Sequence, residues 1–469
     1  MQTRDIFANI SPLDHRYSRD EDDYAEISKY LSEKATIALQ AEVELALIKV
    51  LAARGLAPQT APAEVEKAIA ELTTAEVYAE EAKTKHNIRA LVNCLQKKVS
   101  KKCRPFLHFT ATSYDIVDTA NSLRYQKTAR ELILPRLKKL HKSWAEIAFR
   151  EKDRVQIGRT HGQHAVPITF GFTIAEYVAR LGERIEEIEA KTDKLVGKFA
   201  GAVGAYNASS IFFDDPEAFE KEVLAELGLK AGEHSTQIVQ AEPMTDFVHT
   251  LVSTFSVLAA FADDMRQLQR SEIAEIGEFF AKDQVGSSTM PHKRNPINYE
   301  NVKSLWKAFM PQMTTVYLDQ LSEHQRDLTN SASSRFIPEL ITALLSAVSR
   351  LTRVSSKMVV DQKNMQKNFE QNKKMIVAEP LYILLAAAGH PDAHEAVRKL
   401  TLEAQKTDLS LKELVAQSKE LKGYWENFRD LQKEIILKPE KYTGIAAQKT
   451  EKIVKNWQKK FAYELQLEV

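Results

Sequence analysis

The segment IAEYVARLGERIEEI, residues 174–188, indicates the fold class of this chain. Its apolar residues Ile174, Val178, Leu181, Ile185 and Ile188 follow one another at steps of four, three, four and three residues. In an α-helix this spacing places all five side chains on one face. The segment therefore predicts a long helix that buries one side.

Three further segments carry the same spacing. Their apolar residues are Ile133, Leu137, Leu140, Trp144 and Ile147; Val248, Leu251, Phe255, Leu258, Ala262 and Met265; and Ile337, Ile341, Leu344, Val348 and Leu351. Steps averaging about 3.5 residues favour helices packed side by side at shallow angles. Only 15 glycines and 15 prolines occur in 469 residues, whereas proteins with many strands need many turns. We predict an all-α fold in which these stripes form the core of a long-helix bundle.

The pattern changes on either side of this bundle. Residues 1–111 show shorter helical patterns, and residues 361–469 are rich in Lys and Gln. An apolar segment at 378–390 ends in Gly389, with Pro391 just beyond, a pair typical of a helix stop. We predict three helical domains: an N-terminal domain over 1–111, a central bundle over 112–360 and a C-terminal domain over 361–469.

The composition excludes several classes of protein. Sixty-five Lys and Arg balance 64 Asp and Glu, so the basic excess typical of nucleic-acid binding is missing. The two cysteines, Cys94 and Cys103, are interpreted as free thiols in a reducing compartment. The N-terminus lacks the apolar core of a secretory signal, and no run approaches the roughly 20 apolar residues that span a bilayer. We therefore expect a cytoplasmic protein that contacts neither nucleic acid nor membrane.

The stretch GSSTMPHKRNP, residues 286–296, stands out between two helical segments. It combines a flexible glycine, two adjacent serines, a lysine, an arginine and an asparagine, and its two prolines prevent an ordinary helix. Such a loop can surround an anion with backbone N–H groups and a cation. From the residues alone, a plain polar loop is an equally good interpretation.

Three other polar segments interrupt the apolar pattern: HFTATSYDIVDT (108–119), GRTHGQHAVP (158–167) and HQRDLTNSASSR (324–335). Each lies at the edge of a long periodic segment, so a bundle can bring them together at its helix ends. Taken singly, each is a weak signal, because a lone histidine is more often a surface or core residue than a catalytic one.

Taken together, these segments resemble the conserved blocks of the fumarase/aspartase superfamily. The stretch 286–296 matches its signature, Gly-Ser-Ser-x-Met-Pro-x-Lys-x-Asn, and the segments 112–119 and 158–167 resemble its other two blocks in the same order. Several details resemble the adenylosuccinate lyases of that superfamily: Ser11–Tyr17, Lys85 and His86, His108, Ser235–Gln237, Arg326–Ser331 and Arg335. The sequence MPHKRNP, residues 290–296, also resembles that of carboxymuconate cycloisomerases.

The resemblance implies a C–N lyase of purine biosynthesis. We expect no metal or other cofactor, because the 12 histidines and two cysteines show no zinc-like spacing and the elimination needs no Lewis acid if the loop stabilises the charge. Fumarate would be released from adenylosuccinate, giving AMP, and from succinyl-carboxamide imidazole ribotide (SAICAR), giving AICAR. Ser287 would be the base, helped by loop N–H groups and Lys293, which lower its pKa. His161 would be the general acid, because histidine titrates near the operating pH. The neighbouring His164 lies in the same segment, but the family match places the acid at His161. Glu300 would orient His161 or the loop, unless it is simply an exposed helical residue.

The resemblance also implies a set of substrate contacts. A monophosphate would be held by arginines, whose planar fork suits phosphate oxygens, and by single hydroxyl donors: Arg16, Tyr17, Arg326, Ser331 and Arg335. His86 and His108 would contact phosphate or carboxylate, although Asn87 stands where the family often has Asp. Lys293 and Asn295 would hold the succinyl carboxylate. Further contacts are carried over at Thr112, Ser113, Thr160, Gln237, Ser288 and Asn301.

The resemblance finally implies a homotetramer whose active sites combine blocks from three chains, and long two-faced helices agree with burial in a shared bundle. Two alternatives stay open. One is another superfamily member, a carboxymuconate cycloisomerase or argininosuccinate lyase, which gains if Arg16, Arg326 and Arg335 do not converge. The other is a catalytically silent helical scaffold, against which intact Ser287, Lys293 and His161 argue.

Overall fold

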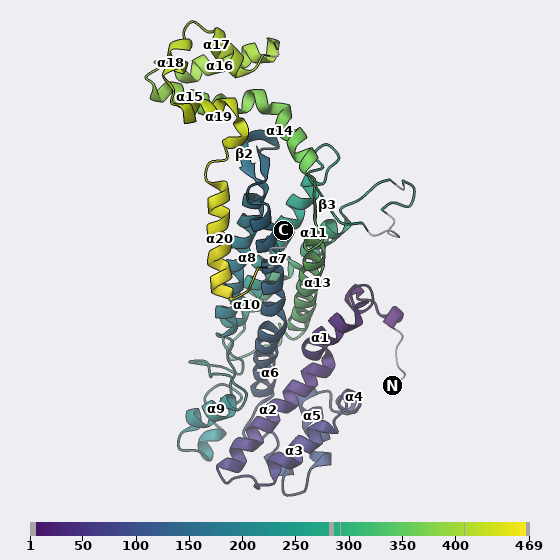
Figure 1. The fold of residues 1–469 in the computed structure, drawn as a ribbon. Helices are drawn as coiled ribbons and strands as arrows, with labels where there is room; N and C mark the ends of the chain where they lie inside the picture. The colour runs from purple at the N-terminus through teal and green to yellow at the C-terminus, as the bar shows by residue number, and fades with distance from the viewer. Residues whose placement is uncertain (1–5, 281–285, 291, 408, 466–469) are drawn as a thin grey trace. The chain divides into compact units, whose positions relative to one another are not determined.

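The computed structural model describes residues 6–280, 286–290, 292–407 and 409–465, and helices dominate these ranges (Figure 1). The all-α prediction is confirmed. Strands in these ranges form two small antiparallel pairs, β1 (Val155–Thr160) with β2 (Gln163–Thr169) and β3 (Ile276–Gly277) with β4 (Val359–Val360). The helices in the same ranges are α1 Glu21–Leu31, α2 Glu33–Ala53, α3 Ala61–Ala70, α4 Thr74–Thr84, α5 Asn87–Lys98, α6 Ser113–Thr128, α7 Leu134–Arg150, α8 Phe170–Thr192, α9 Pro216–Ala225, α10 Glu242–Leu268, α11 Ile297–Phe309, α12 Gln312–Leu318, α13 Ile337–Ser355, α14 Gln362–Ile376, α15 Ala378–Ala387, α16 Ala393–Thr407, α17 Leu411–Gln417, α18 Lys422–Asn427, α19 Asp430–Leu437 and α20 Ala446–Phe461.

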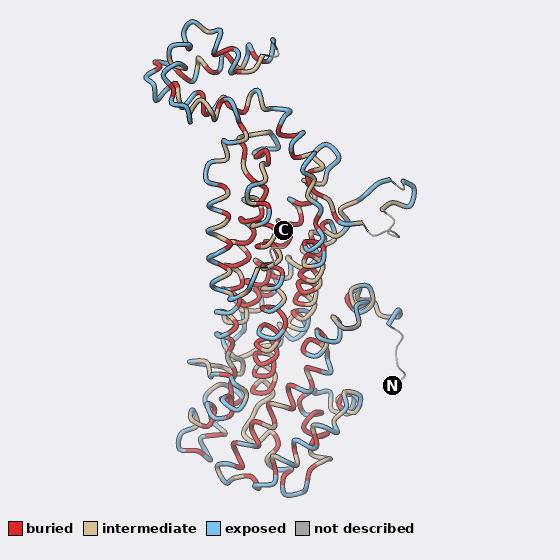
Figure 2. Tube along the Cα trace, viewed as in Figure 1, coloured by how far each residue is buried: buried red, intermediate tan, exposed pale blue. Residues whose placement is uncertain are grey.

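The four predicted apolar stripes lie on the long helices α7, α8, α10 and α13, and each of their residues is buried. Ile133 belongs to the π-helical turn Ala129–Ile133 that leads into α7. Buried positions recur along these helices with half-buried or exposed positions between them (Figure 2). The helical periodicity of the sequence is therefore the periodicity of burial.

The chain divides into two compact units. Unit 1 comprises residues 1–137, 184–256 and 304–349, and unit 2 comprises residues 138–183, 257–303 and 350–469. The predicted division into three domains, with limits near 111 and 360, stays a prediction.

Unit 1 has a core around α2, which packs against α3, α6 and α9. Cys94 and Cys103 lie in this core as free thiols, as the sequence suggested. Burial raises the pKa of Cys103 to about 11, so this thiol stays protonated and packs as a small apolar side chain.

Unit 2 contains a separate cluster formed by α15 to α19. The predicted helix stop is present, because α15 ends at Ala387 and Gly389 has a φ of +86°, the left-handed region that favours glycine. The last helix, α20, packs on α8 where Gly182 faces Trp457. A Cβ at Gly182 would lie 2.5 Å from the indole ring, so only glycine lets α20 approach this closely.

Within the described ranges, one helix, α10, is long and apolar enough to cross a membrane by length and composition alone. However, 67% of its most apolar window is buried inside the protein. The core helix of a soluble protein passes the same test, so these two properties do not make α10 a membrane span.

Candidate active site

The expected general acid, His161, lies at the tip of the β1–β2 hairpin in unit 2. His161 and Gly162 form the turn, with φ angles of +54° and +73°. Two successive left-handed residues are typical of tight hairpin turns, whose twist matches that of the strands. Thr160 and His161 are exposed. The turn therefore presents an imidazole at a fixed point where it can exchange protons.

The hairpin is anchored by Glu275, a carboxylate that the sequence did not single out. Its side chain is fully buried and accepts hydrogen bonds from Arg159 Nη1 at 3.1 Å and Nη2 at 2.5 Å. Gln156 Nε2 at 2.7 Å and Asn368 Nδ2 at 2.9 Å complete its partners. A buried carboxylate with this many donors holds its partners in one geometry, because breaking any contact leaves buried charge unsatisfied. Glu275 thereby fixes Arg159, two residues before His161.

The described loop residues, 286–290 and 292–296, fold back on one another around Ser287. The Ser287 Oγ accepts hydrogen bonds from the backbone N–H groups of Thr289 at 3.4 Å and Met290 at 3.1 Å. Asn295 Nδ2 donates to the carbonyl of Gly286 at 3.0 Å. A Cβ at Gly286 would lie 2.0 Å from the Lys293 carbonyl oxygen, so the two strands of the loop meet backbone to backbone. N–H groups directed at a hydroxyl oxygen favour its alkoxide form.

The described residues that flank this loop are held by Glu278. Its carboxylate accepts from the backbone N–H groups of Asn298 at 2.9 Å and Tyr299 at 3.1 Å, and from Asn298 Nδ2 at 2.5 Å. Glu278 therefore caps the first turn of α11, where donors lack intrahelical partners. Burial raises the pKa of Glu278, and these hydrogen bonds oppose the rise. Gln269 Nε2 also binds the Arg294 carbonyl at 3.2 Å.

In unit 1, Arg326 lies over the ring of Tyr114, with its guanidinium carbon 3.8 Å from the ring centroid. Its Nη2 donates to the Tyr114 hydroxyl, and its Nη1 donates to Asn330 Oδ1 at 3.1 Å. The charges of both Arg326 and Arg335 lower the pKa of Tyr114, although burial raises it overall. Two of the three predicted phosphate-binding arginines therefore share one neighbourhood. The Gln237 N–H donates to the Gln325 carbonyl at 3.3 Å, which brings the 235–237 segment beside Arg326.

His86 and Ser113 also meet in unit 1, with 3.4 Å between Nε2 and Oγ. His86 is the N-cap of α5, because its Nδ1 accepts from the Arg89 N–H at 3.3 Å. Thr112 and Asp115 form a capping box at the start of α6, and buried Asp115 pairs with buried Lys198. These contacts fix Thr112 and Ser113 at the N-terminus of α6, a position that favours anions.

His108 is held by Glu44, a second carboxylate that sequence reasoning missed. Glu44 accepts from the His108 backbone N–H at 2.9 Å, and its other oxygen lies 2.8 Å from Nδ1. Burial disfavours the charged imidazole, but the hydrogen bond and charge of Glu44 raise the pKa of His108 overall. The pair orients the ring so that Nε2 is the nitrogen left for a ligand.

The remaining predicted residues are less engaged. Arg16, Asn87, Ser288, Lys293, Glu300, Ser331 and Arg335 are exposed, and Tyr17 and Asn301 are half-buried. Convergence of Arg16 with Arg326 and Arg335 on one phosphate stays a prediction. His164 lies 3.0 Å from Asn372 Nδ2, and burial and the charge of Arg159 lower its pKa.

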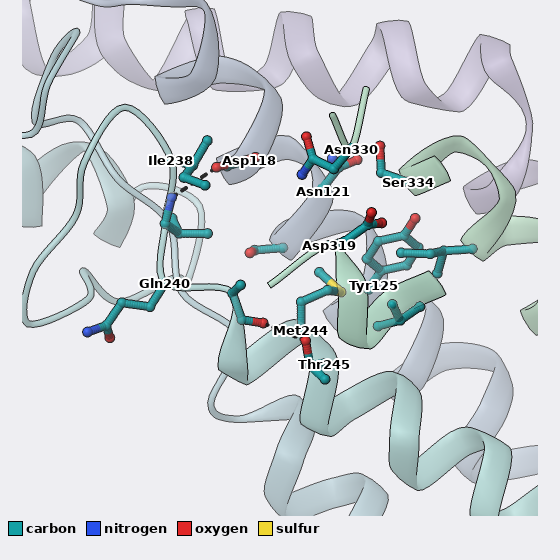
Figure 3. Close-up of a pocket in the computed structure, with 15 residues that line it drawn as sticks. Asp118, Asn121, Tyr125, Ile238, Gln240, Met244, Thr245, Asp319, Asn330 and Ser334 are labelled. Carbon is teal, nitrogen blue, oxygen red and sulfur yellow. Dashed lines mark hydrogen bonds between the residues drawn. The ribbon is translucent and has the colours of Figure 1, made fainter. Parts of the chain in front are cut away.

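A cavity of about 110 Å³ lies in unit 1 beside the Arg326 segment (Figure 3). Asp118 lines it and accepts from the Val239 N–H at 3.0 Å, and burial raises the pKa of Asp118 to about 6. Asp319, which also lines the cavity, accepts from the Ser333 hydroxyl at 2.7 Å. Other residues that line it include Asn121, Tyr125, Ile238, Gln240, Met244, Thr245, Asn330 and Ser334. None of the predicted site residues lines this cavity, although Asn330 is the partner of Arg326.

The helical fold and the loop around Ser287 define a lyase of the fumarase/aspartase superfamily. The sequence model of a family described as "Lyase" matches residues 15–308. The fold is also that of solved structures. That of 3-carboxy-cis,cis-muconate lactonizing enzyme from Pseudomonas putida has a TM-score of 0.82 at 23% identity, covering 94% of this chain and 98% of that one. That of fumarate lyase from Mesorhizobium sp. BNC1 has a TM-score of 0.81 at 21% identity, covering 92% and 97%.

The sequence matches narrow this class. A model described as "Adenylosuccinate lyase C-terminal" matches residues 322–443. Adenylosuccinate lyase from Pyrococcus horikoshii is 35% identical over 95% of this chain and 97% of its own length. The corresponding values are 33%, 95% and 98% for the enzyme from Archaeoglobus fulgidus, and 32%, 85% and 90% for that from Bacillus subtilis. The chain belongs to the adenylosuccinate lyase family.

Proposed function

We propose that this lyase cleaves adenylosuccinate to AMP and fumarate, and SAICAR to AICAR and fumarate. Relatives named adenylosuccinate lyase match almost the whole chain. The observation that carries the chemistry is the pair of backbone N–H groups on Ser287 Oγ. A serine hydroxyl is a poor base in water, and these donors supply part of the stabilisation that an alkoxide needs.

In the proposed mechanism, Ser287 removes a proton from the carbon next to a succinyl carboxylate. The electron pair moves into that carboxylate, where Lys293 and the second N–H of the Asn295 amide offset the extra negative charge. The carbon–carbon double bond of fumarate forms as the C–N bond breaks. His161 then gives its proton to the departing nitrogen. Glu300, which is exposed on α11, is retained only as a candidate for orienting His161.

We propose that Arg326 and Arg335 bind the substrate phosphate, together with Arg16, Tyr17 and Ser331. The Arg326 Nε is a buried N–H group without a hydrogen-bond partner among the described residues. A buried donor without an acceptor is unfavourable, and a phosphate oxygen would satisfy it. His86, His108, Thr112 and Ser113 would contact the succinyl carboxylates or phosphate, as would Asn87, Thr160, Gln237, Ser288 and Asn301.

We further propose that the protein acts as a cytoplasmic homotetramer with active sites shared between chains. Leu318, Leu321 and Leu328 are 62%, 72% and 69% exposed in the single chain. In the sequence, Leu318 and Leu321 precede Arg326, and Leu328 follows it. Apolar area removed from water stabilises an assembly by about 25 cal/mol per Å², so a subunit interface at this segment would also cover the phosphate-binding residues.

The function is tested by following the absorbance of adenylosuccinate with the parent protein and with Ser287→Ala and Thr289→Ala. Thr289→Ala is the matched control, because it changes a hydroxyl in the same loop but keeps the backbone N–H that reaches Ser287. We expect conversion to AMP and fumarate by the parent and by the control, and a loss of at least about a thousandfold in kcat for Ser287→Ala.

A parent protein that leaves adenylosuccinate unchanged would contradict the proposed substrate and direct attention to 3-carboxymuconate and argininosuccinate. An active Ser287→Ala would leave the lyase activity in place and remove Ser287 as the base. Equal losses in both variants would mean that loop folding, rather than the Ser287 oxygen, was disturbed.

A further inference from the structure

The side chain of Arg326 is held on two sides by neutral groups. The Tyr114 ring lies beneath its guanidinium at 3.8 Å, and the Tyr114 hydroxyl accepts from Nη2. Asn330 accepts from Nη1 at 3.1 Å. Tyr114 belongs to the first turn of α6. Arg326 lies 212 residues later in the sequence, and Asn330 belongs to the same segment as Arg326.

This arrangement orients the cation without placing a carboxylate in direct contact with it. Among the described residues, no carboxylate lies within ion-pair distance of Arg326, so its hydrogen bonds go to a phenol and an amide. A free arginine side chain has many rotamers, and ordering them opposes binding. Stacking on an aromatic face and a hydrogen bond at its edge select one orientation in advance.

The ring also links two parts of the proposed site. Tyr114 directly follows Thr112 and Ser113, the proposed carboxylate contacts, and Thr112 is fixed by the buried Asp115. Position 114 is therefore rigid in the backbone, because it is enclosed by the capping box of α6. A rigid ring is a better support for a long flexible side chain than an exposed loop residue would be.

We propose that Tyr114 is a positioning residue that holds Arg326 for the phosphate group of the substrate. Tyr114 acts through Arg326 and does not touch the reacting atoms. This inference rests on the proposed function, because it takes the ligand of Arg326 to be a nucleotide phosphate. It predicts that the contribution of Tyr114 to affinity depends on that phosphate and disappears when Arg326 is removed.

The full-length protein is compared with Tyr114→Leu, Tyr114→Phe, Arg326→Ala and the double variant Tyr114→Leu/Arg326→Ala. Tyr24→Leu, on α1 of the same unit and partly exposed, is the matched control for loss of a tyrosine. The measurements are KM and kcat for adenylosuccinate, and the dissociation constants of AMP and of adenosine by calorimetry. Circular dichroism checks that each variant is folded.

We expect Tyr114→Leu to raise KM and the AMP dissociation constant by about tenfold to thirtyfold, with kcat changed less than about threefold. Tyr114→Phe keeps the stacking and loses one hydrogen bond, so about threefold to tenfold is expected. Adenosine binding should not change in either variant. The double variant should bind AMP no more weakly than Arg326→Ala, because Tyr114 has no effect without its partner.

Three outcomes would overturn the inference: unchanged AMP binding in both Tyr114 variants, equal weakening of AMP and adenosine, or losses that multiply in the double variant. If Tyr114→Leu does not fold, Tyr114→Phe decides by the same criteria. A parent protein that binds AMP through Tyr114 and Arg326 but does not cleave adenylosuccinate would refute the proposed function and leave the positioning role intact.

Discussion

Replacing His141 with glutamine should make the docking of α20 less sensitive to pH. His141 lies on α7 of unit 2 and is fully buried. Its Nε2 lies 3.0 Å from the Val178 carbonyl, which can only accept, so Nε2 carries the hydrogen. Its Nδ1 accepts from the Tyr463 hydroxyl at 3.1 Å. Trp457 and Phe461 of α20 contact the ring, at centroid distances of 5.7 and 5.0 Å.

Burial lowers the pKa of His141 from 6.5 to about 4, and the hydrogen bond to Val178 only partly opposes this. The unfolded or undocked state therefore binds more protons than the folded state between pH 6.5 and 4. Docking is fully stable above pH 6.5 and loses stability as the pH falls. With these two pKa values, linkage gives a loss of about 2 kcal/mol between pH 7 and pH 5, and about 3 kcal/mol below pH 4.

The assay is hydrogen exchange of backbone amides in α20, read by mass spectrometry and corrected for the intrinsic pH dependence of exchange. A loss of about 2 kcal/mol corresponds to about a thirtyfold loss of protection in α20 at pH 5 relative to pH 7. Glutamine keeps an N–H donor for Val178 but has no group that titrates in this range. His141→Gln should therefore show the pH-dependent loss of protection only weakly, whatever its protection at pH 7.

The matched control is His394→Gln, which replaces an exposed histidine on α16 of the same unit. It should retain the parental pH dependence in α20. Equal pH dependence in the parent and His141→Gln would refute the reasoning, because some other group would then be responsible. A loss of pH dependence in both glutamine variants would also refute it, because exposed histidines would account for the effect.

Two further perturbations probe unit 1 and the loop. Burial raises the pKa of Asp118 to about 6, so the ionised carboxylate destabilises the folded state above that pH. Asp118→Asn can still accept from Val239 and should raise the melting temperature at pH 7.5 but not at pH 4. The gain in the free energy of unfolding should be at most about 3 kcal/mol. An unchanged difference across this range would contradict the assignment. Gly286→Ala would place a Cβ 2.0 Å from the Lys293 carbonyl oxygen. The resulting overpacking strain of about 1–3 kcal/mol should lower kcat by roughly tenfold to a hundredfold with little change in melting temperature. Full activity in steady-state assays would show that the close approach of Gly286 to Lys293 is not required for catalysis.

The β1–β2 hairpin has a signal in the sequence, although the predictions from the sequence do not include it. The sequence indicates only a polar interruption around His161, whereas this segment forms a two-stranded hairpin. The signal was present in the alternation of Val155 and Ile157 before a two-residue turn that ends in Gly162. Such short strands are easily missed in a helical chain, because their alternation covers too few residues to compete with the helical spacing on both sides.

Sequence alone determined the helical bundle and the loop at 286–296. The periodicity of Ile174 to Ile188 is local, and burial of one helix face follows from it wherever the rest of the chain lies. The loop was recognisable because its chemistry is concentrated in eleven residues. Only the tertiary structure decided how the candidate site residues are supported.

Glu44 lies 64 residues from His108, Glu275 lies 116 residues from Arg159, and Tyr114 lies 212 residues from Arg326. The position of a buried carboxylate or ring in the sequence does not predict which residue it contacts, because the contact depends on how distant segments pack. Periodic burial is encoded along the chain, and the pairing of polar groups across it is fixed only when the chain has folded.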